Sequence, residues 1–385
     1  MGPYSWLKPI VLRADPERTH QVTVALCAAA GRLGIPKLLQ PIFAVESPRL
    51  SITIAGLSFP NPVGLAAGFD KSGRAVRLLS RLGFGSVEVG SVSENPSHGN
   101  RQRPRLWRLE VDEGLRVFYG CPNDGAIAVA ARLRRAKLCV PLGINLIETN
   151  TGTVSSAEHA AQELARAIGC FADIADYIVL NLNCPNMPQG GRGLFDDSKE
   201  LSMLLGLCAA AHGTLPPVFL KLTPPDDPED PGVIESILSA ADPYPFIKGF
   251  ILNIVNRSPY TTLRTPRLDL DRMRGGITGP LLLKPTNAAL SAWYARIDCS
   301  RHALIGVGGI FSAADAYQML RSGASLVQLY TALVYRGPGL VRQINEGLLK
   351  LLDRDGFKRV TDAVGADVHA GNNHLRSSAR QDTLQ

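Results

Sequence analysis

Short apolar runs rich in β-branched residues recur along the chain, and amphipathic segments separate them. Nearly continuous apolar character is what parallel strands covered on both faces require. The segments between the runs show helical periodicity, which predicts a helix after most strands. The runs begin at Asn61, Gly85, Val140, Asp176, Pro217, Ile247, His302 and Ala324. This alternation predicts an α/β protein built as a (β/α)8 TIM barrel, which we assign to residues 46–365.

A doubly wound parallel sheet is the alternative arrangement of the same units. That fold normally carries a glycine-rich turn after its first strand and an acidic residue about 20 positions later. The turn after the first predicted strand, "AAGFDKSG", does not match this pattern. The barrel is therefore the preferred prediction.

Residues 1–45 follow a different pattern, which predicts two or three short amphipathic helices as a small domain in front of the barrel. One apolar face consists of Leu7, Ile10, Val11 and Leu12, and another of Val22, Val24, Leu26 and Leu33. Periodicity alone leaves two roles open, a packing cap on the barrel or attachment to a membrane interface. Residues 366–385 are polar and lack a pattern, so we expect a flexible tail.

The composition is that of a soluble globular protein, with 45% apolar and 19% charged residues and a net charge of +7. No basic run is interleaved with aromatic residues, which argues against nucleic-acid binding. The seven cysteines are widely spaced without a CxxC pair, which predicts neither a disulfide framework nor a metal site and fits a reducing compartment. No apolar run reaches the roughly 18 residues that span a bilayer. We expect a cytoplasmic location, with peripheral attachment to the inner membrane left open.

Glycine and polar residues gather at the predicted carboxyl ends of the strands, where barrels place their active sites. The seventh strand ends in Gly308 and Gly309, and Ser312 then opens a helix. This is the construction of a phosphate site, although a tight turn would also use glycine. Lys221 lies inside the apolar run "VFLKLT", where an ammonium group needs an anionic partner. A phosphate-bearing cofactor that becomes anionic on reduction satisfies both features, which points to flavin mononucleotide (FMN).

The fourth predicted strand runs into the stretch "VLNLNCPNMPQGG", which carries Asn181, Asn183, Cys184 and Asn186. Amide side chains at a strand end suit the binding of a polar ligand. Taken alone, a single cysteine is more often a buried hydrophobic residue than a reactive group.

The chain resembles the dihydroorotate dehydrogenases of the membrane-associated, quinone-using class (class 2). The resemblance extends from "DPERTH" to "VTDAVGAD", and its most specific motifs are "NPVGLAAGFDKSG", "GFGSVEVGSV", "RPRLWRL", "GVGGI" and "GASLVQLYTAL". It implies an FMN-dependent oxidoreductase that acts on a CH–CH bond at the mouth of a barrel. It also implies a helical segment in front through which a quinone reaches the flavin, which favours membrane contact by the first 45 residues.

The resemblance also implies roles for individual residues. Flavin contacts fall at Ala66, Ala67, Ser91, Asn145, Asn181, Lys221, Gly279, Gly308, Gly309, Tyr330 and Thr331. Lys71 would pair with a substrate carboxylate, Lys221 would stabilise the reduced flavin, and the quinone would lie against His20, Arg108 and Tyr330.

Cys184 falls at the family's catalytic base, where quinone-using members usually have serine and soluble members have cysteine. A free thiol has a pKa of about 8.5, and a modest downward shift brings this pKa towards neutrality. Cys184 is therefore a plausible base.

The substrate positions depart from the family pattern. Asn181 and Asn186 are kept, but Val117 and Ile254 stand where the family has asparagine, with Asn253 close to the second position. Further changes are Cys121 for an aromatic residue, Pro122 for asparagine, Val255 and Met187 for threonine, with Asn256 also near. Each lost hydrogen bond to a polar ligand costs about 1–3 kcal/mol. Three hypotheses therefore remain, namely dihydroorotate as substrate, a less polar or non-pyrimidine biosynthetic substrate, and a non-catalytic flavin-binding homologue.

Overall fold

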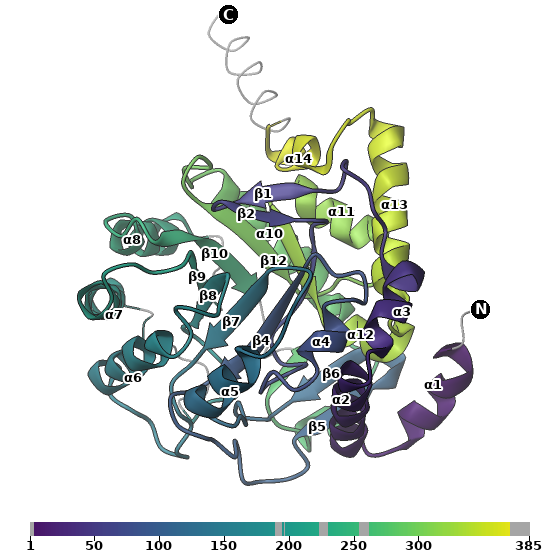
Figure 1. Cartoon of the computed structure of the whole chain (residues 1–385), viewed down its shortest axis with the longest axis horizontal. Coiled ribbons are helices and arrows are strands. Elements are labelled where there is room, and N and C mark those ends of the chain that lie inside the picture. The colour runs from purple at the N-terminus through teal and green to yellow at the C-terminus, as the bar shows by residue number, and fades with distance from the viewer. Residues whose placement is uncertain (1–3, 189–194, 196, 223–229, 254–261, 370–385) are drawn as a thin grey trace, which may run out of the picture.

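Eight parallel strands close into a barrel in the computed structural model, which describes residues 4–188, 195, 197–222, 230–253 and 262–369 (Figure 1). Each barrel strand pairs with the next one along the chain, and the last pairs back to the first. The strands are β3 (Val63–Leu65), β4 (Ser86–Val92), β7 (Leu142–Leu146), β8 (Tyr177–Asn181), β9 (Val218–Leu222), β10 (Ile247–Asn253), β12 (Ala303–Val307) and β13 (Leu326–Leu329). The predicted barrel and its strands are confirmed, and the closed ring excludes the doubly wound sheet.

Helices surround this ring (Figure 1). The principal ones are α4 (Val76–Leu79), α5 (Ala126–Leu133), α6 (Ala157–Gly169), α7 (Ser198–Ala211), α8 (Pro231–Ala241), α10 (Leu283–Tyr294), α11 (Ala313–Arg321) and α13 (Leu340–Asp355). Shorter helical turns are α9 (Arg267–Asp271), α12 (Thr331–Arg336), α14 (Val360–Ala363) and the 3-10 turns Glu110–Asp112 and Pro280–Leu282. Ser156, Asp197 and Ser312 each accept a hydrogen bond from a backbone N–H of the following helix, as N-cap residues do.

The strands and the inner faces of the helices share one apolar core. Every residue of β4, β7, β9 and β13 is buried, as expected for strands covered on both faces. Trp293 of α10 packs on Phe250 of β10 with ring centroids 5.0 Å apart. This packed ring fixes the strand ends from which the candidate site is built.

Two small antiparallel sheets lie at opposite ends of the barrel (Figure 1). The hairpin of β1 (Ile52–Ile54) and β2 (Leu57–Phe59) lies where the barrel strands begin. At the other end, β5 (Leu106–Leu109) and β6 (Gly114–Val117) pair with β11 (Gly276–Thr278). This second sheet, which we call the roof sheet, joins the segment after β4 to the segment after β10.

Three helices precede the barrel, in agreement with the prediction of two or three: α1 (Tyr4–Arg13), α2 (Pro16–Arg32) and α3 (Ile35–Phe43). The Asp15 side chain caps α2 by accepting a hydrogen bond from the Arg18 N–H at 2.8 Å. Glu17 on α2 is buried and pairs with buried Arg105 just before β5, which anchors the helix to the barrel. Among the described helices no single one is long and apolar enough to cross a membrane, although α2 and α3, bent by 108°, meet that test as a pair.

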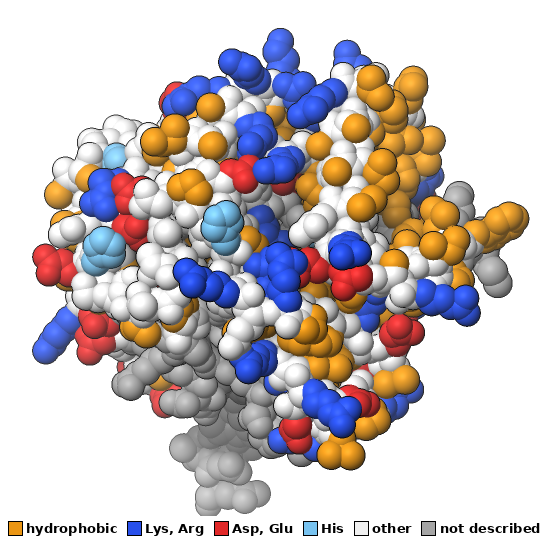
Figure 2. All heavy atoms as spheres, turned by 90° about the horizontal axis from the view of Figure 1, so that it is seen from below, with side chains coloured by type: hydrophobic (Ala, Val, Ile, Leu, Met, Phe, Trp, Pro, Cys, Tyr) orange, Lys and Arg blue, Asp and Glu red, His pale blue; other side chains and the backbone are white. Residues whose placement is uncertain are grey.

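The outer faces of these helices expose large apolar side chains, visible in Figure 2 on the side that carries α1 to α3 in Figure 1. Trp6 is 82% exposed, and the other exposed members are Leu7, Ile10, Val22, Leu26, Leu33, Leu38 and Ile42. Val11, Leu12 and Val24 are half-buried instead. Each predicted apolar face is therefore divided between the barrel side and the solvent side.

The first residues of the predicted tail contact the barrel helices. Arg321 pairs with Asp367 at 2.5 Å, and the Tyr294 hydroxyl lies 3.3 Å from His369 Nε2. Residues 370–385 lie outside the described residues.

Candidate active site

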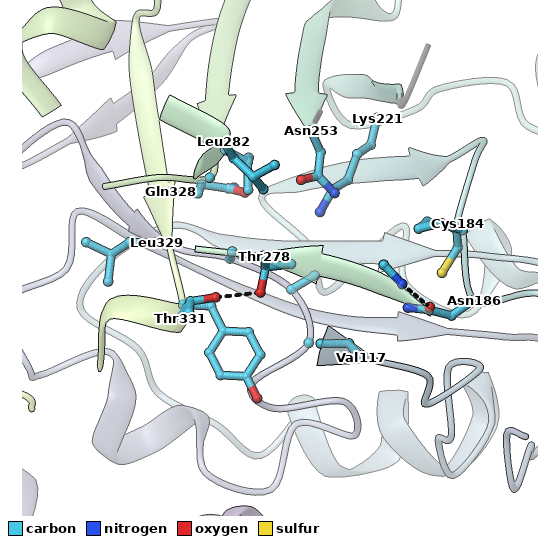
Figure 3. A pocket seen from close by; sticks show the side chains of 18 of the residues that line it. Val117, Cys184, Asn186, Lys221, Asn253, Thr278, Leu282, Gln328, Leu329 and Thr331 are labelled. Atoms are coloured by element: carbon cyan, nitrogen blue, oxygen red, sulfur yellow. Dashed lines mark hydrogen bonds between the residues drawn. The ribbon is translucent and has the colours of Figure 1, made fainter. Parts of the chain in front are cut away.

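A deep cavity opens where the barrel strands end, and its space, including the solvent-filled mouth, is about 1170 Å³ (Figure 3). We call it the main cavity. The predicted site residues that line it are Ala66, Ala67, Lys71, Ser91, Asn181, Cys184, Asn186, Lys221, Asn253, Gly279, Gly308, Gly309, Tyr330 and Thr331. The roof sheet and its loop add Val117, Cys121, Gly276 and Thr278, which bring a second segment of the chain to the site.

Gly308 and Gly309 bring bare backbone to one wall of the main cavity. Their φ angles are 111° and 82°, a region that side chains other than glycine rarely adopt. A Cβ atom on Gly309 would lie 2.4 Å from the Leu283 nitrogen. Thr331 begins α12 beside them, and its hydroxyl oxygen lies 2.9 Å from that of Thr278 (Figure 3). Backbone N–H groups and hydroxyls in this arrangement suit a phosphate group.

Ser312 caps α11 as predicted, but it does not line the cavity. The helix that begins at the cavity is the short α12, which the sequence pattern did not predict.

A chain of hydrogen bonds leads from the main cavity into the barrel interior. Asn181 Nδ2 donates to Ser91 Oγ at 2.9 Å, and Ser91 Oγ donates to Asn145 Oδ1 at 2.5 Å. Asn145 Nδ2 and Gln328 Nε2 then donate to the two carboxylate oxygens of Glu88, at 2.7 and 2.6 Å. Asn145, expected to contact the flavin, does not line the cavity and holds Ser91 from behind.

Glu88 and Gln328 were missed by the sequence analysis, although a signal for them exists. Both are polar residues inside strands whose other members are buried and mostly apolar. Gln328 also lines the main cavity, and its buried Oε1 has no hydrogen-bond partner among the described residues. An unpartnered buried acceptor at a cavity wall indicates that a ligand N–H group belongs there.

Lys221 and Asn253 lie side by side at the ends of β9 and β10 (Figure 3). Lys221 is only 6% exposed and makes no hydrogen bond or ion pair with another described residue. A buried ammonium group without a partner is costly, so an anionic ligand fits this position. The predicted changes at Ile254 and Val255, and nearby Asn256, lie outside the described residues.

The loop after β8 brings Asn183, Cys184 and Asn186 to the main cavity. The Met187 N–H donates to the Cys184 carbonyl at 3.1 Å, which closes a turn around the cysteine. Asn186 Oδ1 accepts a hydrogen bond from the Gly276 N–H at 3.3 Å, which ties the loop to the roof sheet.

Two of the departures from the family pattern lie at this cavity. Val117 ends β6 and presents an apolar side chain (Figure 3). Cys121 lies four residues further along, and its Sγ atom is 3.6 Å from Cys184 Sγ. Met187 is buried and does not line the cavity. The proximity of the two thiols was not predicted.

Lys71 enters the main cavity from the loop after β3. Its Nζ atom donates to the Gly68 carbonyl at 2.7 Å, lies 3.3 Å from His20 Nε2 and stands 4.3 Å from the Tyr119 ring centroid. Burial lowers the pKa of Lys71 to about 8, although the nearby Cys121 thiol opposes this shift. The ammonium is therefore charged at neutral pH and available to a carboxylate.

A second, largely apolar cavity lies between the N-terminal helices and the barrel, and we call it the apolar cavity. His20, Arg108 and Tyr330 all line it, together with Val11, Thr19, Cys27, Leu39, Phe43, Phe69, Leu78, Leu79, Leu82, Phe84 and others. Burial lowers the pKa of His20 to about 2, so its ring is neutral. Tyr330 lines both cavities, and its hydroxyl lies 3.4 Å from His20 Nδ1.

Comparisons with known proteins agree with this geometry. The family model described as "Dihydroorotate dehydrogenase" matches residues 49–352. A protein of Halobacterium salinarum named "Dihydroorotate dehydrogenase (quinone)" is 37% identical over 368 residues, which cover 95% of this chain and 100% of the relative. A protein of the same name from Sphingopyxis alaskensis is 38% identical over 372 residues, covering 94% and 96%.

A solved structure of an Eimeria tenella dihydroorotate dehydrogenase in complex with ferulenol superposes with a TM-score of 0.79. It is 28% identical in sequence, and the match covers 94% of this chain and 98% of that one. On this evidence, the chain belongs to the dihydroorotate dehydrogenase family.

Proposed function

We propose that this protein is a quinone-linked dihydroorotate dehydrogenase that oxidises dihydroorotate in the main cavity and delivers the electrons to a quinone in the apolar cavity. The observation that carries the proposal is the position of Tyr330, which lines both cavities. One side chain thus lies between a site with ammonium and amide groups, which suits the substrate, and an apolar site, which suits a quinone. The curated relatives bear this activity in their names, and the family is flavin-dependent.

The residues of the main cavity fit FMN as the flavin. The backbone of Gly308 and Gly309 and the Thr331 hydroxyl would hold its phosphate. The Gln328 oxygen, which has no hydrogen-bond partner within the described part of the chain, would accept from a ring N–H. The Lys221 ammonium would face the ring edge that gains negative charge. When bound, the flavin would supply a hydride acceptor that a quinone can reoxidise. Asn145 would act through Ser91, whose position it fixes.

Substrate binding would fall to Lys71 and three asparagines. The charged Lys71 would pair with the dihydroorotate carboxylate. Asn181, Asn186 and Asn253 each carry an acceptor and two donors, which match the amide groups of the substrate ring.

Cys184 would take the proton from the substrate carbon that lies against its sulfur, acting as general base. Two ammonium groups line the same cavity, Lys71 and Lys221, and they favour a negatively charged sulfur.

A less polar relative of dihydroorotate is the second candidate substrate, and Val117 is the observation that favours it. This side chain offers no hydrogen bond where the family has an asparagine. One missing hydrogen bond weakens binding by about 10- to 100-fold. The cavity does not favour the third hypothesis, a non-catalytic flavin protein. Its lining carries a thiol and two ammonium groups, which suit catalysis.

We also propose peripheral contact with the cytoplasmic side of a membrane through α1 to α3. Their exposed apolar side chains suit the boundary between headgroups and acyl chains. The apolar cavity lies beneath the same helices, so a quinone dissolved in the bilayer could enter without crossing water. Flotation with anionic vesicles tests this contact. The wild-type chain should float, and replacement of Leu26 and Leu38 by glutamate should leave it in the dense fraction.

Anaerobic mixing of the flavin-loaded protein with dihydroorotate tests the main proposal. The flavin absorbance should bleach and should return when a short-chain quinone is added. Cys184→Ala should slow bleaching by about 10²- to 10⁴-fold. Cys299→Ala is the matched control, because Cys299 is exposed and lies outside both cavities, and it should bleach at the wild-type rate.

If millimolar dihydroorotate does not reduce the bound flavin, the proposal is wrong. Bleaching by a less polar analogue alone would select the second candidate. Full activity in Cys184→Ser would show that the thiol has no special part in proton removal.

A further inference from the structure

Two thiols face each other inside the main cavity, although 63 positions separate them in the chain. The sulfur atoms of Cys121 and Cys184 lie 3.6 Å apart, and both side chains are partly exposed to the cavity. A disulfide has an S–S distance of about 2.05 Å. A shift of about 1.5 Å between the two sulfurs would bring them to bonding distance.

The two loops that carry these thiols are fixed to each other by Asn100. Its side-chain Nδ2 donates to the Phe118 carbonyl at 3.1 Å and to the Asn186 carbonyl at 2.9 Å. One amide therefore bridges the segment before Cys121 and the segment after Cys184. The hydrogen bonds of Asn100 therefore hold the two loops, and with them the two thiols, close together.

The backbone at Cys121 is also held in an unusual conformation. Cys121 has a φ of 55°, a left-handed value that costs a residue other than glycine about 1 kcal/mol or more. Asn150 Nδ2 donates to the Gly120 carbonyl at 2.9 Å, and Asn123 Nδ2 donates to the Cys121 carbonyl at 3.0 Å. The surrounding amides stabilise the turn that directs this thiol into the cavity.

The surroundings of Cys121 disfavour its ionisation. The hydrogen bond with Cys184 and burial raise the pKa of Cys121 well above its usual range, while Lys71 and Lys221 act in the opposite direction. Cys121 therefore stays protonated beside Cys184. A neutral thiol next to a potential thiolate, with two cations nearby, is the arrangement in which one sulfur attacks an oxidant and the other resolves the product.

We propose that Cys121 and Cys184 form an oxidative modification site, at which a hydroperoxide converts the two thiols into a reversible disulfide and removes the catalytic base. The Cys184 thiolate attacks the peroxide O–O bond, which yields a sulfenic acid and releases hydroxide or alkoxide. The Cys121 thiol then displaces the sulfenic hydroxyl, so that the S–S bond forms and water leaves. The two electrons lost by the thiols reduce the peroxide. A disulfide sulfur cannot accept the substrate proton, so turnover stops until a thiol reductant restores the pair. This inference rests on the proposed role of Cys184 as base.

The test uses the full-length, flavin-loaded protein treated with hydrogen peroxide in slight molar excess. Wild type should lose the mass of two hydrogen atoms, and peptide mapping should find Cys121 linked to Cys184. Turnover should fall in proportion to the linked fraction and return fully with dithiothreitol. Each variant is compared with its own untreated activity.

Two variants separate this site from other thiol chemistry. In Cys121→Ser no linked peptide can form, so treatment should leave a sulfenic acid on Cys184 that a dimedone probe labels, whereas wild type should label weakly. The double variant Cys139→Ser, Cys299→Ser removes the two exposed thiols outside the pair and should form the link as wild type does.

The absence of a linked Cys121–Cys184 peptide after treatment overturns the proposal, as does full turnover in a fully linked sample. The linkage is measured on the protein itself. If the link forms but dihydroorotate does not reduce the flavin even before treatment, the proposed function fails while the thiol site stands.

Discussion

Lys71 should set an upper pH limit for the binding of a carboxylate ligand. Its ammonium is enclosed by the Gly68 carbonyl, the Tyr119 ring and the neutral His20 ring, and burial lowers its pKa to about 8. A lysine with a lowered pKa is charged below that value and neutral above it. Its attraction for a carboxylate is therefore present at pH 7 and is lost as the pH rises through 8.

The size of the effect follows from the titration. About nine-tenths of Lys71 is charged one pH unit below its pKa, and about one-tenth one unit above it. We predict that the Kd for orotate, the oxidised product, rises roughly tenfold between pH 7 and pH 9. His20 has a pKa of about 2 and does not titrate in this window, so the change reports on Lys71.

Titration of the flavin absorbance with orotate gives the Kd at each pH without turnover, which keeps the proposed proton removal by Cys184 out of the measurement. Lys71→Met removes the charge, and its weaker binding should vary with pH only as far as orotate itself titrates. Lys71→Arg stays charged, so it should show no break near pH 8. A wild-type Kd that is flat across this range, or one that changes no more than in Lys71→Met, would refute the reasoning.

Three further substitutions test other parts of the fold. Gly309→Ala places a Cβ against backbone at a φ of 82°, which should weaken flavin binding by about 10- to 100-fold, measured as flavin retained per protein after gel filtration. The control Gly339→Ala meets no atom within 4 Å and should retain full flavin. Glu17→Gln leaves the buried Arg105 without a carboxylate partner and should lower the free energy of unfolding in urea by about 3–5 kcal/mol. An unchanged midpoint would contradict the anchoring role. Glu88→Gln turns an acceptor into a donor that faces amide donors, so the flavin Kd should rise by at least about tenfold; equal affinity would show that the buried network does not shape the site.

The barrel was predictable because each strand is buried on both faces, and this leaves a continuous apolar run that a single sequence displays. The roof sheet was not predictable from the sequence. Its strands β5, β6 and β11 have only three or four residues each, which is too few to show an alternation with a period of two. Because the roof sheet was not predicted, part of the candidate site was missed. Without this sheet, nothing in the sequence places Cys121 beside Cys184.

Candidate site residues were predictable where strand ends identify them, as at Lys221 and Asn253. Contacts across the barrel were not, because Glu88 and Gln328 are 240 positions apart and pair only when the ring closes. Asn145 shows a further limit. Its place near a strand end was correct, but its side chain turns toward Ser91 and Glu88 and not into the main cavity. Spacing identifies the strand, whereas the direction of a side chain depends on its neighbours in space.

The position of Tyr330 between two separate cavities has a kinetic consequence. If the quinone binds in the apolar cavity as proposed, a molecule that fills this cavity takes no volume from the main cavity, so it would block reoxidation of the flavin while dihydroorotate still binds. Raising the dihydroorotate concentration should not relieve such an inhibitor, whereas raising the quinone concentration should. The two cavities thus provide two independent sites for inhibition, one lined by ammonium and amide groups and the other apolar and lying against the N-terminal helices.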